Sequence, residues 1–392
     1  MAKNLKVLFV FTLSLFACFT ANAATSGKLL GNAAFPWTLD DNGVLTITGT
    51  GDMPNATESK LPFPSLRKQI TSIVISGDIT SIGDYVFYEL GEVTELTITA
   101  PIEHTGNYSF AQCSKLSTIN FTNSDSLHTI GEASFAATNL SKIIIPENVT
   151  TIGDYAFMGC MSATQLTIGE KVTTIGDYAF AYCMSATQLT IGEKVKTIGK
   201  SSFEGCFSLP NALFPDAVTT IGESAFAGCS SLEWISLGTS VNSIGDKAFA
   251  GCTGLKRVNS FNPVPPTMNC DYDSTCDKNV GGLNVFDKNT YDTARLRVTG
   301  GYVNTYKAAE GWKHFKKSEI FTSVDAITSN ALKVYANNGE IIVEGAEAAD
   351  VVELYGINGQ LLYRGTKKSI TAPSTGVFIV KAAGKSFKTL VN

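Results

Sequence analysis

The 392-residue chain has few of the side chains on which catalysis and nucleic-acid binding depend. It contains three histidines, and charged residues make up only 17% of it, with a net charge of −5. No basic stripe is present to neutralise phosphate groups, which argues against a nucleic-acid partner. His104, His128 and His314 have no spacing that gathers them with a cysteine or an aspartate, and no phosphate-binding loop, zinc spacing or cofactor fingerprint occurs. We therefore expect a protein that is not an enzyme and that needs no cofactor and no metal.

Long apolar runs are also lacking. The run at 7–18 is too short to span a membrane, and no later segment reaches about 18 unbroken apolar residues. This run follows Lys3 and Lys6 and precedes Ala21-Asn22-Ala23, the small-x-small pattern that a signal peptidase cuts. The sequence thus predicts a signal peptide at 1–23 and an exported protein, at the cell surface or outside the cell. Leu15-Phe-Ala-Cys18 resembles a lipoprotein processing box, which leaves lipidation of Cys18 open as an alternative.

Glycine, by contrast, is abundant and periodic. Eight of the 35 glycines recur at intervals of 22 to 25 residues, most often 23: Gly83, Gly106, Gly131, Gly153, Gly176, Gly199, Gly222 and Gly245. A fixed period in this range is typical of a solenoid. A unit this short cannot bury an apolar face alone, so neighbouring units must stack around one continuous core. We predict a solenoid of about eight units over 81–258.

Each unit has the pattern of a short strand followed by a turn. In one unit, Leu232, Ile235 and Leu237 have the spacing L-x-x-I-x-L that leucine-rich repeats use for a strand. Gly245 then suits a turn that tolerates positive φ, and Asp246 is positioned to cap a brief helical turn. The fold class predicted is therefore mainly β with short helical turns.

Stacking of the units aligns equivalent residues in columns. One apolar column consists of Phe87, Phe110, Phe135, Phe157, Phe180, Phe203, Phe226 and Phe249. A second consists of Cys113, Cys160, Cys183, Cys206, Cys229 and Cys252. A disulfide framework or a metal site is one interpretation of these cysteines. We favour small buried thiols, because five consecutive units cannot all pair among themselves and no histidine repeats beside them.

An acidic column follows the repeated glycines. It contains Asp84, Glu132, Asp154, Asp177, Glu223 and Asp246. Calcium binding is one interpretation. Capping of the turn is the one we favour, because each acid follows the glycine directly and Lys200 interrupts the series.

The repeat phrases carry a family resemblance. Thr151-Ile-Gly-Asp-Tyr-Ala-Phe157 and Ala225-Phe-Ala-Gly-Cys-Ser-Ser-Leu232 resemble the BspA-like leucine-rich repeats of bacterial surface proteins. The stretch at 37–53 is similar to the opening of many such proteins, and Ala308-Ala-Glu-Gly-Trp-Lys-His-Phe315 to their closing segment. The resemblance implies a secreted or surface-exposed protein, often an adhesin that binds host matrix proteins or other bacteria.

The regions that flank the repeats read as caps and a separate tail. A hairpin around Asp41-Asn42-Gly43 predicts an N-terminal cap over 24–80, and the broken repeat pattern predicts a C-terminal cap over 259–325. Cys270 and Cys276, close together in a polar insertion, are the predicted disulfide. Alternating strands from 326 to 392 predict a small antiparallel β-sandwich. This tail resembles the C-terminal sorting domains of the type IX secretion route; an ordinary immunoglobulin-like module is the alternative.

The outward positions of the strands form the candidate binding surface. Trp234 with Leu213 and Arg257 is the cluster richest in the residue types that dominate interface energies. Packing of Trp234 under a neighbouring loop is the alternative. The predicted ligand-binding residues are Trp234, Arg257, Leu213, Asn211, Gln188, Gln165, Lys142 and Ile144. We expect a protein partner in the host extracellular matrix or on a bacterial surface, with glycan binding and a non-binding structural spacer as alternatives.

Overall fold

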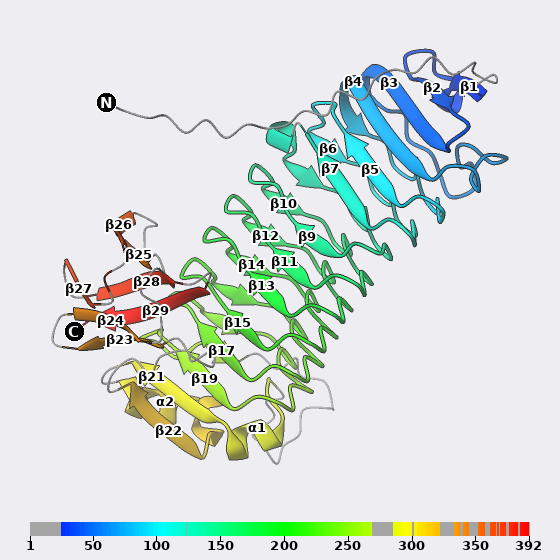
Figure 1. Ribbon diagram of the computed structural model, residues 1–392. Coiled ribbons are helices and arrows are strands. Elements are labelled where there is room, and N and C mark those ends of the chain that lie inside the picture. The colour runs from blue at the N-terminus through cyan, green and yellow to red at the C-terminus, as the bar shows by residue number, and fades with distance from the viewer. Residues whose placement is uncertain are drawn as a thin grey trace, which may run out of the picture.

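The computed structural model shows a chain that is mostly β, coiled into an elongated solenoid and followed by a small β-rich unit (Figure 1). The first 24 residues, Cys270 and Cys276 lie outside the described residues, so the signal peptide and the disulfide stay predictions. The described residues are 25–122, 124–268, 285–299, 302–321, 333–337, 340–344, 352–356, 361–365, 367, 369–373, 376–382 and 385–391.

The solenoid begins with the predicted hairpin. Strand β1 (Thr25–Lys28) and a short 3-10 turn, η1 (Leu29–Gly31), precede strands β2 (Pro36–Leu39) and β3 (Val44–Asp52), which pair antiparallel. The Asp40 carboxylate tightens the hairpin turn, because its Oδ1 accepts the Asn42 and Val44 N–H groups at 2.9 and 2.8 Å. Strand β3 then pairs in parallel with the long β4 (Ser72–Ile82), so the stack of rungs starts here.

Two series of parallel strands run along the solenoid (Figure 1). The narrow sheet contains two-residue strands: β6 (His104–Thr105), β8 (Thr129–Ile130), β10 (Thr151–Ile152), β12 (Thr174–Ile175), β14 (Thr197–Ile198), β16 (Thr220–Ile221), β18 (Ser243–Ile244) and β20 (Thr267–Met268). The second series, which we call the strand face, contains β5 (Glu95–Ile98), β7 (Thr118–Phe121), β9 (Lys142–Ile144), β11 (Gln165–Thr167), β13 (Gln188–Thr190), β15 (Asn211–Leu213), β17 (Trp234–Leu237), β19 (Arg257–Ser260), β21 (Arg295–Thr299) and β22 (Lys317–Phe321).

The strand face is interrupted twice. Strands β4, β5 and β7 form one part, β9, β11 and β13 a second, and β15 to β22 a third. The second interruption coincides with Pro210. At this position in other rungs a backbone N–H donates to the rung before, as Thr187 does to the Thr164 carbonyl at 2.9 Å. Proline has no N–H to donate, so this bond is missing between the rungs of β13 and β15, which do not pair.

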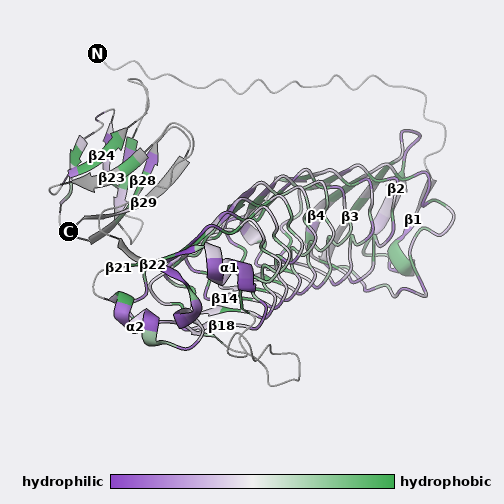
Figure 2. Ribbon diagram, turned by 90° about the horizontal axis from the view of Figure 1, so that it is seen from below, coloured by the Kyte–Doolittle hydropathy of each residue, from purple (hydrophilic) through white to green (hydrophobic). Residues whose placement is uncertain are grey.

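The phenylalanine column forms the centre of the core, as predicted. Successive rings from Phe87 to Phe249 stack nearly parallel, with centroids 4.9 to 5.6 Å apart. Phe286, which the repeat pattern did not identify, extends the column at 5.2 Å from Phe249. One apolar cluster joins Leu29 to Phe315, so both caps share the core of the solenoid. Hydrophobic and hydrophilic residues alternate along the coils (Figure 2).

The cysteine column consists of buried free thiols, which confirms the packing interpretation. All six, from Cys113 to Cys252, are buried and unbonded to one another. The Cys206 Sγ donates to the Phe180 carbonyl at 3.4 Å, so each thiol of this kind ties one rung to its neighbour. Burial raises the pKa of the Cys206 thiol to about 12, and the pKa of the Cys160 thiol to about 11.

The predicted helical turn after each repeated glycine is wrong. The Tyr155 and Phe157 N–H groups donate to the Asp177 and Ala179 carbonyls of the next rung, at 2.7 and 2.8 Å. Because these N–H groups bond across rungs, they are not available for the bonds within the segment that a helix needs. Tyr155 adopts a φ of 58°, in the left-handed region. The segment is a turn that forms a third ladder between rungs.

The roles of the glycine and of the acid in this turn also differ from the prediction. Gly245 does not have a positive φ. The glycine column is required by close approach: a Cβ on Gly176 would lie 2.6 Å from the Gly153 carbonyl carbon of the rung before. Asp84, Asp154 and Asp177 bond to the following rung, as when the Asp177 Oδ1 accepts the Lys200 N–H at 2.7 Å. Glu132 and Glu223 instead accept side-chain hydrogen bonds from Tyr108 and Lys200 of the rung before.

The C-terminal cap contains two short helices beyond the last rung (Figure 1), and aromatic side chains pack within it. The helices are α1 (Lys288–Thr293) and α2 (Val303–Ala308), and a 3-10 turn, η5 (Trp312–His314), follows. The Trp312 ring contacts Phe286, and its Nε1–H donates to the Pro266 carbonyl at 2.8 Å. The open apolar end of the stack is thereby closed.

The tail forms the predicted antiparallel sheets. One contains β23 (Lys333–Asn337), β24 (Glu340–Glu344) and β27 (Ser369–Thr371). The other contains β25 (Val352–Gly356), β26 (Leu361–Gly365), β28 (Gly376–Ala382) and β29 (Lys385–Val391). A separate apolar cluster that includes Val334, Ile341, Val352 and Val380 gives this unit its own core.

Candidate functional site

The strand face aligns the predicted binding residues in two columns. Strand register places Gln165 between Lys142 and Gln188, and Trp234 between Asn211 and Arg257. Ile144 and Leu213 belong to the neighbouring column. Because β13 and β15 do not pair, the eight residues fall into two groups rather than one continuous surface.

The two groups differ in exposure. Lys142, Gln188 and Ile144 are exposed, and the Ile144 side chain is 59% exposed despite being apolar. Trp234 and Arg257 are half-buried. The exposure of Trp234 is therefore intermediate between the two alternatives of the sequence analysis, an outward residue and a residue packed under a loop.

The second column departs from the predicted outward surface at its C-terminal end. Ser236 and Asn259 lie in register on β17 and β19, yet both are buried. Their Oγ and Oδ1 atoms are also without a hydrogen-bond partner in the part of the chain that the structure describes. These two positions do not belong to an accessible surface of the described fold.

The Trp234 column continues into the C-terminal cap. Arg295 lies opposite Arg257, and Lys317 lies opposite Arg295. Sequence reasoning missed these cations because the insertion at 269–284 breaks the 23-residue period that identified the earlier outward positions. The tryptophan thus stands beside a row of three basic residues.

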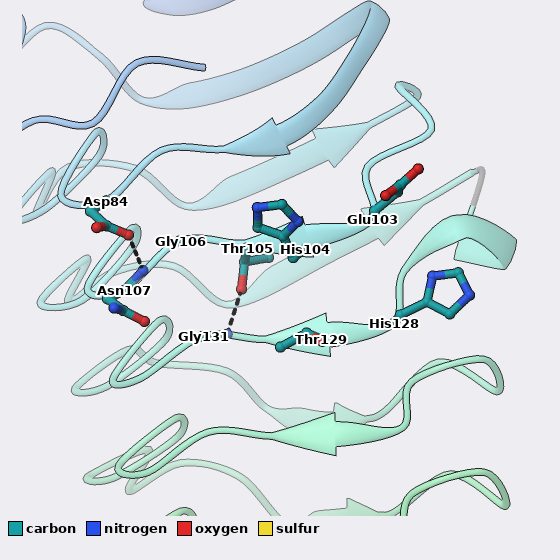
Figure 3. Close-up of a pocket in the computed structure, with 9 residues that line it drawn as sticks. All are labelled: Asp84, Glu103, His104, Thr105, Gly106, Asn107, His128, Thr129 and Gly131. Atoms are coloured by element: carbon teal, nitrogen blue, oxygen red, sulfur yellow. Dashed lines mark hydrogen bonds between the residues drawn. The ribbon is translucent and has the colours of Figure 1, made fainter. Parts of the chain in front are cut away.

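A polar groove lies on the narrow sheet (Figure 3). It has a volume of about 440 Å³ and is lined by Asp84, Glu103, His104, Thr105, Gly106, Asn107, His128, Thr129 and Gly131. His104 takes the position that threonine has in the next rung, because it lies opposite Thr129. The Asp84 Oδ1 accepts the Asn107 N–H at 2.7 Å and the Thr105 Oγ1 accepts the Gly131 N–H at 3.1 Å, so both side chains serve the ladder between rungs.

The groove brings together groups that the sequence kept apart, without completing a catalytic set. Figure 3 shows the His104 and His128 rings on successive rungs, with the Glu103 side chain between them in this view. Hydrogen bonds from Thr80 and Ser81 lower the pKa of the nearby Asp52 carboxyl. Over the described ranges, no three His, Cys, Asp or Glu side chains form a group that could hold a metal ion.

Comparison with known proteins gives the family. The model of the BspA type leucine-rich repeat region matches residues 65–164 and 150–265, in six copies, which is slightly more than half of the chain. The chain belongs to this BspA-type family. The family is of the bacterial surface-protein type, as the repeat phrases predicted. No helix among the described residues is long and apolar enough to cross a membrane.

Solved structures include distant leucine-rich repeat proteins. One from Eubacterium ventriosum is 22% identical with a TM-score of 0.43, and the match covers 72% of this chain and 80% of that one. The T. pallidum leucine-rich repeat protein is 20% identical, with a TM-score of 0.36 and coverages of 57% and 88%. A leucine-rich cell surface protein from Faecalibacterium prausnitzii is 18% identical, with a TM-score of 0.25 and coverages of 67% and 98%. No curated protein matches the sequence.

Proposed function

We propose that this BspA-type protein is an exported, adhesin-like protein whose solenoid binds a macromolecular partner through the strand face. The partner is a protein of the host extracellular matrix or of a bacterial surface. The chain acts by binding rather than by catalysis, and the C-terminal β unit sorts it to the cell surface or displays it there. Leucine-rich repeat proteins in general mediate protein interactions, which supports a protein partner.

The register around Trp234 is the observation that carries the proposal. Trp234 lies beside Asn211 on one side and Arg257 on the other. Tryptophan and arginine are the residue types most enriched among interface hot spots. A half-buried indole is also held in place before the partner arrives, which reduces the entropy lost on binding.

A binding screen followed by one substitution tests the proposal. The mature chain is screened against matrix proteins, bacterial surface proteins and glycans, and Trp234→Ala is then measured against whatever binds. We expect affinity to fall by about 2 kcal/mol or more, which is about 30-fold. Tyr155→Ala is the matched control, because Tyr155 is an exposed aromatic residue on a turn, away from the strand face.

Three outcomes would contradict the proposal. Unchanged affinity of Trp234→Ala for a protein that the solenoid binds would remove the strand face as the site. A large loss of stability in that variant would show that Trp234 serves packing. Binding of glycans without proteins would favour the glycan alternative, and binding of nothing would favour the spacer.

A further inference from the structure

The first interruption of the strand face opens a cleft between β7 and β9. The two rungs meet at one end, where the Ser141 N–H donates to the Ser117 carbonyl at 3.5 Å, and again at the other, where the Thr150 N–H donates to the His128 carbonyl at 2.9 Å. Between these points, among the described residues, β7 pairs with β5 alone and β9 with β11 alone. The facing strand edges therefore lack the ladder that joins other rungs.

An insertion accounts for the cleft. The interval from Gly106 to Gly131 is 25 residues, the longest in the series, and the added residues follow β7, where a short 3-10 turn, η2 (Ser124–Ser126), occurs. A longer connection displaces the end of β7 from its neighbour while the turn and the narrow sheet stay in register. Here the extra chain separates one pair of strands and leaves the others stacked.

The cleft reaches the apolar core. It encloses about 210 Å³, and its lining is mostly apolar, with Phe135 and Phe157 of the phenylalanine column among the residues that contact it. Ile119 and Phe121 point inward like Ile143 and Ile145 in the next rung. The latter two are 2% and 4% exposed, whereas Ile119 and Phe121 are only partly buried. Two core side chains thus remain accessible at this break.

The rim of the cleft carries apolar and cationic groups. Ile144 projects from β9 with 59% of its surface exposed. Lys142 lies at the start of the same strand, is exposed, and has no ion pair with any residue that the structure describes. Lys115, Lys200 and Lys256 each pair with a glutamate one rung away, such as Lys115 with Glu92 at 2.6 Å, whereas Lys142, like Lys196, has no such pair among the described residues. The cleft therefore offers a positive charge beside an apolar opening.

We propose that this cleft receives one large apolar side chain of a protein partner, phenylalanine or leucine in type, with an acidic residue next to it that pairs with Lys142. The volume is below the roughly 300–1,000 Å³ of typical small-molecule pockets and suits a single side chain. The strand edges that face the cleft lack a ladder partner, so their N–H and C=O groups can add polar contacts to the partner at its mouth. Desolvated pockets of this kind hold the anchor residues of interfaces.

The proposal rests on the proposed function, since it names the chemistry by which the strand face holds a protein. It also differs from the Trp234 site in place, because β9 and β17 lie in separate parts of the interrupted sheet. The two can therefore fail independently.

Two short peptides test the cleft directly. The full chain is labelled with 13C at the isoleucine methyl groups and titrated with N-acetyl-Asp-Phe-amide, and with N-acetyl-Asp-Ala-amide as the matched peptide that lacks the ring. We expect saturable shifts at the methyls of Ile119, Ile143 and Ile144 with a dissociation constant on the order of 1 mM. The alanine peptide and the methyl of Ile244, which lies in the narrow sheet, should show no saturable shift.

Charge reversal then tests the role of the lysine. Lys142→Glu is at an exposed position and should fold normally. It should lower the affinity for the Asp-Phe peptide about two- to fivefold and raise the affinity for N-acetyl-Lys-Phe-amide. Lys196→Glu, also exposed and outside the cleft, should change neither. Absence of saturable shifts at the cleft methyls, equal binding of the alanine peptide, or equal effects of the two lysine variants would overturn the proposal. If Trp234→Ala binds the peptide normally but no longer binds the intact partner protein, the cleft acts independently of the Trp234 site.

Discussion

Truncation of Phe180 is the most direct test of a continuous core. The ring is fully buried, with its centroid 5.4 Å from that of Phe157 and 5.3 Å from that of Phe203. Phe180→Ala removes the ring from both neighbours and leaves a cavity that three rungs share. Large-to-small changes of this type lower the free energy of unfolding by about 3 to 5 kcal/mol. Stacked pairs supply about 0.5 to 1.5 kcal/mol each of that loss.

Phe87 provides the comparison within the same column. It is also fully buried, but it is the first ring of the column and stacks on Phe110 on one side. Phe87→Ala should therefore lower the free energy of unfolding less than Phe180→Ala does, and the difference should be about the 0.5 to 1.5 kcal/mol of one stacked pair. Met161→Ala, which shortens a side chain that is 54% exposed, serves as a control with a small expected change.

Guanidinium chloride titration followed by far-UV circular dichroism measures these differences. Repeat arrays can depart from two-state unfolding, so the slope of each transition must be compared as well as its midpoint. Equal losses for Phe87→Ala and Phe180→Ala, at unchanged slope, would refute the reasoning that ring stacking is shared along the column. A loss below about 1 kcal/mol for Phe180→Ala would show that the rungs close around the missing ring.

Three further predictions follow from the ladders and the thiols. Denatured, unreduced protein should yield at least five titratable thiols. In the native protein these thiols should react slowly with a thiol reagent at pH 8, because burial raises the pKa of thiols such as Cys206 to about 12 and keeps them protonated. Recovery of one thiol or none from the denatured protein would contradict this. Asp177→Ala should lower stability by about 0.5 to 1.5 kcal/mol through loss of the Lys200 N–H bond, while Asp177→Asn should not; equal losses would point to charge instead. Pro210→Thr should protect the amide at position 210 from hydrogen exchange by restoring a donor to Thr187; fast exchange there would show that another feature holds β13 and β15 apart.

Much of the fold was readable from the period of the sequence. The phenylalanine and cysteine columns were predicted residue by residue, because equal spacing along the chain becomes stacking when every rung has the same path. The turn after each repeated glycine was wrongly predicted to be helical. Its N–H groups bond to the next rung, and a helical turn cannot be distinguished from such a ladder by the spacing of Gly153, Asp154 and Phe157 alone.

On the candidate binding surfaces, some residues could be predicted from the sequence and others could not. The column of β9 to β19 that contains Lys142 and Trp234 followed from the period, whereas Ser236 and Asn259 of the neighbouring column are buried. Arg295 and Lys317 did not, because the insertion before the cap removes the spacing that would align them. The cleft had a visible signal in the 25-residue interval after Gly106. That interval predicts a longer connection, and it does not say which strands the connection separates.

The sequence by itself determined the solenoid, its caps, the order of residues along each column and the membership of the BspA-type family. These depend on spacing and residue type, which are properties of the chain. The tertiary structure decided where the strand face is interrupted, how far Trp234 is buried, why the glycines recur and that a cleft reaches Phe135 between β7 and β9. Those depend on which groups of neighbouring rungs meet, and such contacts exist only once the rungs are stacked.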